Sequence, residues 1–293
     1  MIKVILDTDI ADDIDDAFAL DFILKNDDKF ELLGVVTVFK NVLERAKIAK
    51  KIIRLNKKDT PVFMGENEPL KSKVVYFNYE KNNHLLSYKP SLDVEKIEDA
   101  NGIDFILKTI KDNPHEIVLL GIGPSTNIAK AIMKDFETMK LVKKIVIMQG
   151  TNNLEPIYAK EWNVLVDPEA SNILMTSKLP VRFVSHEITC QSTLNNEELK
   201  KVLSANNPSA KYINEMLGEW MNANKRMPVL HDVLPIYSLI SNDCFIFKTV
   251  SVEVPLDEEK RGSWLIKEDK NSNKEVAISF NRKQFIDYFM SIY

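Results

Sequence analysis

The sequence has little cysteine and no excess of positive charge. It contains 2 cysteines in 293 residues, Cys190 and Cys244, far apart and without the spacing of a metal site. That usage excludes a disulfide scaffold, fits a reducing compartment, and predicts two buried free thiols. Lys and Arg number 39 against 43 Asp and Glu, which gives a net charge of -4. Nucleic acid is therefore not expected as a partner.

Long apolar runs are also lacking. No stretch approaches the roughly 20 apolar residues that span a bilayer, and the first residues read as a strand followed by acids rather than a cleavable signal. We therefore expect no membrane association and a cytoplasmic location. Hydrophobic residues at 45% and charged residues at 28% are close to globular averages. These properties favour a protein that acts on a small molecule.

Short apolar runs alternate with segments of helical period along most of the chain. The expected strands are 3–6, 32–37, 61–64, 117–120, 144–148 and 181–184, and the expected helices are 14–25, 43–55, 102–111, 126–133 and 168–176. This alternation is typical of βαβ units in a mostly parallel sheet. Asp13, Ser125 and the Asp167-Pro168 pair precede helical segments, where such residues commonly begin a helix.

The remaining segments depart from this alternation. Residues 71–100 are polar and rich in Lys and Asn, which predicts a long surface loop that could serve as a lid. From about residue 192 to 227 the pattern is helical, and 249–254, 262–266 and 275–280 read as antiparallel strands. No linker divides the chain. We expect one domain over 1–293, of the α/β class, with a mostly parallel open sheet flanked by helices, a helical addition and a small antiparallel C-terminal part.

Six carboxylates fall within ten residues directly after the first expected strand: Asp7, Asp9, Asp12, Asp13, Asp15 and Asp16. Like charges this close repel, and burying them unpaired is costly. In an open parallel sheet, ligands bind beyond the carboxyl ends of the strands, where these acids stand. A helix N-terminus accounts for two or three acids, whereas a hard cation such as Ca²⁺, with oxygen ligands, accounts for more. This segment alone leaves both interpretations open.

Four motifs together resemble the inosine-uridine-preferring nucleoside hydrolase family. Asp7-Thr-Asp9 with Ile14-Asp-Asp-Ala17 is similar to the opening Asp-x-Asp-Pro-Gly-x-Asp-Asp-Ala of that family, with a two-residue expansion between its halves. Residues 119–129 (LLGIGPSTNIA), residues 160–170 (KEWNVLVDPEA) and His231-Asp232 match three later motifs. The resemblance implies the fold of the family, hydrolysis of a ribonucleoside to ribose and free base, a Ca²⁺ cofactor, and a homodimer or homotetramer.

For the metal site, we expect the protein ligands Asp9, Asp16, Asp232 and the main-chain carbonyl of Ile122, the last two of these implied by the resemblance. Water and ribose hydroxyls would complete a shell of about 6–8 oxygens. Asp15 is adjacent to a ligand but on another side of the first helical turn. It is the candidate base, because a nearby cation keeps its carboxylate ionised and ready to accept a proton. Asp7 is expected to orient its neighbours.

Further residues are assigned to the substrate. By resemblance Glu161, Asn163 and Asp232 bind ribose hydroxyls and Trp162 offers a flat wall to the sugar, although Trp162 is equally consistent with ordinary core. His231 is expected near the nucleobase, as a leaving-group acid or a base contact, or else is a hydrogen-bonded histidine under a loop.

Four further polar residues carry weaker signals. Asn41 follows the second expected strand, where it matches a ribose-region asparagine of the family or caps the next helix. His84, His115 and His186 show no constellation with other functional residues.

Three functions are compatible with these residues. A Ca²⁺-dependent ribonucleoside hydrolase is favoured. A divergent member that binds ribosyl compounds with weak turnover is the first alternative, because residues 73–88 replace the His-Gly-x-Asp-Gly loop of many members. A Mg²⁺-dependent aspartyl phosphotransferase is the second, since Asp7-Thr-Asp9 after a strand suits an acyl-phosphate nucleophile. Ala11 stands where that family has Thr or Val.

Overall fold

The computed structural model describes residues 1–71, 95–151, 160–257 and 259–293. Its strands are β1 (Ile2–Thr8), β2 (Phe30–Thr37), β3 (Val62–Met64), β4 (Val118–Gly121), β5 (Lys144–Met148), β6 (Val181–Val184), β7 (Phe245–Glu253), β8 (Leu265–Glu268) and β9 (Lys274–Phe280). They form a nine-stranded sheet in the order β3-β2-β1-β4-β5-β6-β9-β7-β8. In this spatial order, each neighbouring pair from β3 through β2, β1, β4, β5 and β6 to β9 is parallel, whereas β7 is antiparallel to both of its neighbours. The α/β class and the mostly parallel sheet are confirmed.

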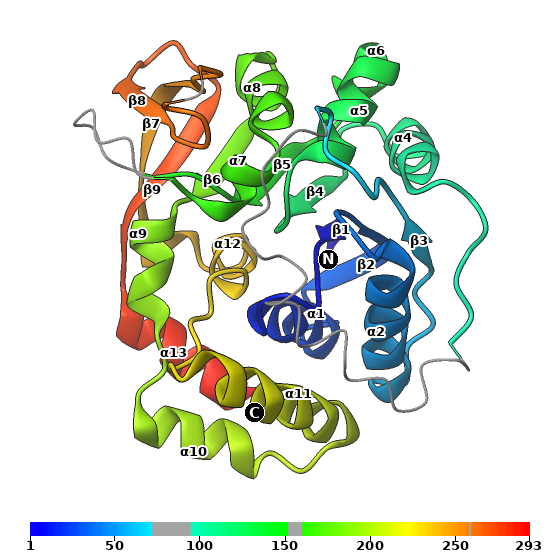
Figure 1. Ribbon diagram of the computed structural model, residues 1–293, viewed down its shortest axis with the longest axis vertical. Helices are drawn as coiled ribbons and strands as arrows, with labels where there is room; N and C mark the ends of the chain where they lie inside the picture. The colour runs from blue at the N-terminus through cyan, green and yellow to red at the C-terminus, as the bar shows by residue number, and fades with distance from the viewer. Residues whose placement is uncertain (72–94, 152–159, 258) are drawn as a thin grey trace.

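Helices cover both faces of this sheet (Figure 1). The helices are α1 (Asp15–Lys25), α2 (Val42–Leu55), α4 (Gly102–Asp112), α5 (Thr126–Lys134), α6 (Phe136–Met139), α7 (Trp162–Val166), α8 (Pro168–Thr176), α9 (His186–Thr189), α10 (Asn196–Ser204), α11 (Pro208–Asn224), α12 (Val233–Tyr237) and α13 (Arg282–Ser291), with 3-10 turns η3 (Cys190–Ser192) and η4 (Asn242–Cys244). Among the described residues, no helix combines the length and apolar character needed to cross a membrane.

Alternate residues of the central strands enter two separate cores. In β1, Val4 and Leu6 belong to the core that packs against α1, α2, α11, α12 and α13, while Ile5 belongs to the core against α4, α5 and α8. Since successive strand residues point to opposite faces, a strand buried on both faces reads as a continuous apolar run. This explains why the sequence predicted the positions of β1 to β6 closely.

The expected antiparallel C-terminal part is confirmed, and it continues the main sheet. Strand β9 joins the main sheet parallel to β6, with Val181 opposite Lys274, and only then pairs antiparallel with β7. The Lys274 side chain is 2% exposed, and its Nζ donates to the carbonyl oxygens of Ser177 and Leu179 over 2.7 and 2.8 Å. Strand order depends on such long-range contacts, and therefore the local pattern did not reveal it.

Helix starts agree in part with the sequence. Asp167 Oδ1 accepts a hydrogen bond from the backbone N–H of Ala170 over 3.0 Å, with Pro168 as the first residue of α8. Ser125 occupies the same position before α5, but its side chain makes no capping hydrogen bond. Most of the expected surface loop, residues 72–94, lies outside the described residues. The expectation of two buried thiols is half wrong, because Cys244 is buried but Cys190 is partly exposed.

Candidate functional site

A cavity of about 520 Å³ opens at the carboxyl ends of β1, β4, β5 and β6. Its lining residues are Asp9, Asp12, Asp13, Asp15, Asp16, Ile122, Met148, Lys160, Glu161, Trp162, Asn163, Leu165, His186, Trp220, Asn224, Arg226, His231 and Asp232. The position agrees with the rule that open parallel sheets bind ligands beyond their strand ends. Except for Asn41, every residue that the sequence assigned to metal, base or substrate lines this cavity.

The acidic segment turns from β1 into α1 at one end of the cavity. Asp15 and Asp16 form the first turn of α1, and both are buried. The hydroxyl of Thr8 donates to Asp16 Oδ1, and it accepts a hydrogen bond from the backbone N–H of Ile10 over 3.0 Å. Ala11, inside the two-residue expansion, has a φ of 99°, a conformation that is uncommon for a residue with a side chain. The segment is therefore folded back tightly on its own first turn.

Asp15, Asp16 and Asp232 form a buried triad whose carboxylate oxygens lie within 4.8 Å of one another. Burial raises the pKa of each carboxyl well above its usual range, and neighbouring carboxylates raise it further: Asp13 for Asp15, Asp9 for Asp16, and Asp15 for Asp232. Three buried anions at this distance repel strongly unless a cation neutralises them. The donor set is all oxygen, which fits a hard divalent cation of the Ca²⁺ or Mg²⁺ type.

Asp9 and Ile122 lie beside this triad. Burial raises the pKa of Asp9 to about 7. A Cβ atom at Gly123 would stand 2.7 Å from Asp9 Oδ1, and therefore the close approach of the β4 end to the acidic segment requires glycine there. The carbonyl oxygen of Ile122 accepts a hydrogen bond from Asn163 Nδ2 over 3.1 Å. Asp9 and Ile122 therefore line the same cavity as the triad, but Asp15 belongs to the triad and Asp9 does not.

Asp7 has a structural place behind the cavity. It is 1% exposed, and its Oδ1 accepts a hydrogen bond from Asn127 Nδ2 over 2.7 Å. Burial raises its pKa to about 8. Asn127 also donates to the Thr37 carbonyl over 3.2 Å, so Asp7 helps to join β1, β2 and α5.

Arg45 is a supporting residue that the sequence analysis missed. Its guanidinium is fully buried and donates to the carbonyl oxygens of Phe39, Lys40, Asp9 and Ile10 and to Asp12 Oδ2. The positive charge lowers the pKa of Asp9 and Asp16, against the larger effect of burial. An arginine on the apolar face of α2, beside Ala46, Ile48 and Ala49, was the available signal.

Glu161 and Asn163 bind the backbone at the strand ends. Glu161 begins α7 and accepts hydrogen bonds from the N–H groups of Gly150, Asn163 and Val164 over 3.0, 2.8 and 3.1 Å. Burial raises its pKa to about 7, against those three donors. Asn163 Nδ2 donates to the carbonyls of Ile122 and Met148. These bonds occupy the amide nitrogen of Asn163 and leave its amide oxygen for a ligand.

Trp162 and Asn41 lie in different surroundings. Trp162 is 41% exposed, packs edge-on against Phe39 and lines the cavity, so it is not ordinary core. Asn41 is exposed and lies, with a φ of 48°, at the start of α2. In the described part of the chain it does not line the cavity, and its side chain does not cap α2. The structure therefore supports neither role expected for Asn41.

His231 and His186 form the other end of the cavity. Their rings lie nearly parallel, with centroids 5.4 Å apart, and His231 Nδ1 lies 2.6 Å from the hydroxyl oxygen of Thr189. Burial, then the charges of His186 and Arg226, lower the pKa of His231 to about 3. His186 had no role assigned from the sequence, but it lines the cavity. Its place just after β6, at a strand end, was the missed signal. His115 is exposed and away from the cavity, and His84 lies outside the described residues.

The chain is similar to known proteins both in sequence and in fold. The family model of the inosine-uridine preferring nucleoside hydrolase matches residues 4–287. Uridine nucleosidase 1 of Arabidopsis thaliana is 29% identical over 267 residues, covering 86% of this chain and 78% of the relative. The solved structure of a plant nucleoside hydrolase has a TM-score of 0.88 at 23% identity, covering 99% of this chain and 98% of that chain. The solved structure of a purine-preferring ribonucleoside hydrolase from Gardnerella vaginalis has a TM-score of 0.83 at 23% identity, covering 99% of this chain and 97% of that chain.

Proposed function

This chain belongs to the inosine-uridine preferring nucleoside hydrolase family, and from that premise we propose that it is a Ca²⁺-dependent hydrolase that cleaves the N-glycosidic bond of a ribonucleoside. The reaction consumes one water and releases ribose and the free base. The observation that carries the proposal is the buried triad of Asp15, Asp16 and Asp232, whose carboxylate oxygens lie within 4.8 Å of one another in the cavity.

Asp9, Asp16, Asp232 and the carbonyl of Ile122 would hold the cation. Their oxygen donors come from the ends of β1 and β4, the first turn of α1 and the start of α12, and the mutual repulsion of the buried carboxylates is relieved by a divalent charge. When bound, Ca²⁺ supplies positive charge that binds ribose hydroxyls and acidifies a water molecule. All four residues line the cavity.

Asp15 is the proposed base. Its Oδ2 accepts a hydrogen bond from the backbone N–H of Asp232 over 3.1 Å, which fixes the carboxylate relative to the triad. It accepts a proton from the water whose oxygen bonds to C1′ of the ribose, while the bond from C1′ to the nucleobase nitrogen breaks and its electron pair leaves with the nucleobase. The departing nucleobase takes a proton from solvent, and Asp15 returns its proton to solvent, so that one water is consumed. A carboxylate whose pKa is raised by burial is a stronger proton acceptor than one in water.

The ribose and the nucleobase contact opposite ends of the cavity. Glu161 and Asn163 bind sugar hydroxyls, and Trp162 packs against the sugar. His231 contacts the base through Nε2. Two roles were expected for His231: contact with the nucleobase, or proton donation to the leaving group. A pKa of about 3 favours the contact with the nucleobase, because a proton donor must carry the proton first.

The aspartyl phosphotransferase alternative has little support in this geometry. Its nucleophile would be Asp7, which is 1% exposed and bonded to Asn127. Within the described residues, Asp7 does not line the cavity. A phosphoryl donor in the cavity would therefore not reach its carboxylate.

The test is a panel of purine and pyrimidine ribonucleosides with free ribose as the readout. Both classes are needed, because one relative is named for uridine and another for purines. We expect ribose from at least one nucleoside with Ca²⁺ present, and none after chelation. Absence of ribose from every nucleoside, with ribose binding intact, would favour the divergent binding protein instead.

A further inference from the structure

At the end of the cavity lined by His186 and His231, these two side chains and the neighbouring Cys190 form a cluster of a different chemical kind. His186, Cys190 and His231 each offer a ligand atom, and these atoms lie within 4.8 Å of one another. His186 and Cys190 are four residues apart across α9 and the start of η3, a spacing that places two side chains on the same helical face. His231 comes from the segment that precedes α12.

We propose that His186, Cys190 and His231 form a binding site for a Zn²⁺-type divalent cation, with two imidazole nitrogens and one thiolate as ligands. The two histidines line the cavity, so the fourth position of a tetrahedral ion is open to solvent or ligand. The nitrogen and sulfur donors select a borderline or soft cation, whereas the oxygen donors of the acidic triad select a hard one. The two ends of the cavity therefore sort cations by ligand type.

The sulfur–nitrogen and ring–ring separations are close to those of ligands that share a zinc ion. Cys190 Sγ lies 3.4 Å from His186 Nε2 and 3.7 Å from His186 Nδ1. With a Zn–S bond of about 2.3 Å and a Zn–N bond of about 2.0–2.1 Å, a tetrahedral ion places sulfur and nitrogen about 3.5 Å apart. The same geometry places two imidazole centroids about 5 Å apart, and the observed distance is 5.4 Å. The two rings are stacked at an interplanar angle of 16°, so one imidazole must rotate before both ring-plane lone pairs point at the same ion.

Thr189 fixes His231 in the form that a metal requires. The Thr189 hydroxyl donates to the carbonyl oxygen of His186 over 3.1 Å and lies 2.6 Å from His231 Nδ1. A hydroxyl has one proton, so its donation to the carbonyl leaves the imidazole to donate from Nδ1. Nε2 of His231 then carries the free lone pair. Metal-binding histidines commonly have their second ring nitrogen hydrogen-bonded in this way.

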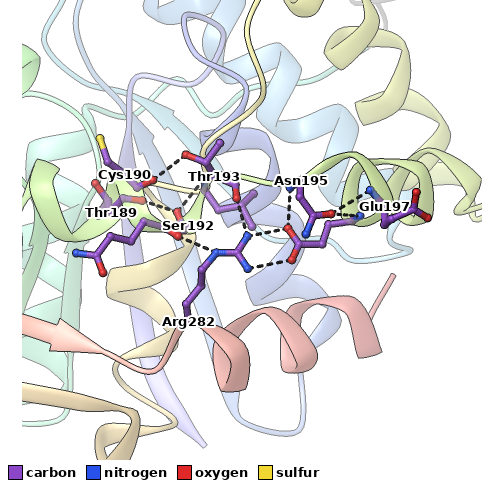
Figure 2. Close-up of polar contacts among 10 residues, drawn as sticks. Thr189, Cys190, Ser192, Thr193, Asn195, Glu197 and Arg282 are labelled. Atoms are coloured by element: carbon purple, nitrogen blue, oxygen red, sulfur yellow. Dashed lines mark hydrogen bonds and ion pairs between the residues drawn. The ribbon is translucent and has the colours of Figure 1, made fainter.

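Arg282 of α13 binds the backbone that directly follows Cys190 (Figure 2). The Arg282 guanidinium donates to the carbonyls of Gln191 and Thr193 over 2.9 and 2.6 Å, and it forms an ion pair with Glu198 at 2.7 Å. The Thr193 hydroxyl donates to the Cys190 carbonyl over 2.7 Å. Figure 2 shows the Cys190 sulfur pointing away from Arg282. The backbone is thus fixed while the thiol remains available to a ligand.

Binding converts the thiol to a thiolate, so one proton passes to the buffer for each ion bound. The ion also takes the lone pair of His231 Nε2. If the proposed function is right, that lone pair contacts the nucleobase, and zinc therefore inhibits hydrolysis by competing with the base for His231. The binding site itself does not depend on the proposed function.

Cobalt provides the direct test, because Co²⁺ bound to a thiolate gives a charge-transfer absorption that oxygen ligands do not give. Co²⁺ is added to the full chain already saturated with Ca²⁺, and Zn²⁺ is then added to displace it. We expect one equivalent of the absorption, lost in Cys190→Ser and kept in the matched variant Cys244→Ser. His186→Ala should weaken Co²⁺ binding at least about tenfold.

No thiolate absorption in the unmodified protein, or absorption that survives in Cys190→Ser, would overturn the site. Circular dichroism checks that each variant is folded, and His186→Ala tests the same site without altering the cysteine. The absorption is read without substrate, so a protein that hydrolyses no nucleoside still tests this proposal.

Discussion

The backbone N–H of Asp232 donates a hydrogen bond to Asp15 Oδ2 over 3.1 Å, and it joins residues 217 positions apart in the sequence. This bond connects the first turn of α1 with the start of α12. It means that the acidic triad exists only in the folded chain, and that the proposed base and a proposed metal ligand share one hydrogen-bonded unit.

Asp15 and Asp16 are neighbours with different proposed roles, and their asparagine variants should separate those roles. Asp15→Asn should retain Ca²⁺ and lose about 10²–10⁴-fold in kcat, because the base is removed. Asp16→Asn should lose about 100-fold in Ca²⁺ affinity, because a charged ligand is removed. Calcium titration and ribose release measure the two effects. Asp28→Asn, at the surface, is the control for loss of one negative charge, and equal Ca²⁺ affinity in the Asp15 and Asp16 variants would contradict the assignment.

Arg45 should matter for stability although it is not expected to touch substrate. Arg45→Met removes the donors to the carbonyls of Phe39, Lys40 and Ile10 and the ion pair with Asp12. We expect a loss of about 3 kcal/mol in the free energy of unfolding, because buried acceptors are left unpaired. Denaturant unfolding measures it. Lys108→Met, whose ion pair with Asp112 lies on the surface, should leave the midpoint unchanged, and a similarly small effect at Arg45 would show that the acidic segment does not depend on it.

The kinetics of a His231 variant should show whether this side chain contacts the nucleobase or acts as a general acid. Loss of one hydrogen bond to the base should lower kcat/KM by up to about tenfold in His231→Ala, whereas loss of a general acid costs about 10²–10⁴-fold. Steady-state kinetics on the best nucleoside of the panel decide between them, with His115→Ala as the matched control at an exposed histidine. A fall of several hundredfold would mean that His231 donates a proton despite its surroundings.

Lys274 should give a pH dependence of stability that lies outside the cavity. Burial lowers the pKa of Lys274 from 10.5 to about 8 in the folded chain. Between these values the unfolded chain binds more protons than the folded one, so stability rises with pH in that window. Relative to Lys274→Met, the free energy of unfolding should increase by up to about 3 kcal/mol from pH 8 to pH 10.5. A constant or falling difference would show that the carbonyl oxygens of Ser177 and Leu179 and the Asn273 Oδ1, which accept hydrogen bonds from the ammonium group, fully offset its burial.

The sequence predicted the repeating part of the fold because β1 to β6 are short apolar runs between helices, a local and periodic signal. It did not predict that β9 lies between β6 and β7, because strand order is decided by contacts between distant segments. The single domain, the dimer or tetramer and the cytoplasmic location stay predictions.

For the site, motifs revealed the acids and the Glu161-Trp-Asn163 segment, since these residues are close in sequence. They did not reveal residues whose importance arises from tertiary packing. Arg45 stands on the apolar face of α2, but its partners meet it only when α2 packs over the acidic segment, and His186 meets His231 only after β6 and α12 are in place. The exposed position of Asn41 likewise depends on the left-handed backbone that begins at Phe39.

The most direct test of the whole account is calorimetry of Ca²⁺ added to chelator-stripped protein, with and without ribose. Asp9, Asp16, Asp232 and the Ile122 carbonyl should bind one Ca²⁺ per chain, more tightly when ribose is present, because sugar hydroxyls complete the oxygen shell. No heat of Ca²⁺ binding in either condition would contradict the metal site, and with it the proposed mechanism.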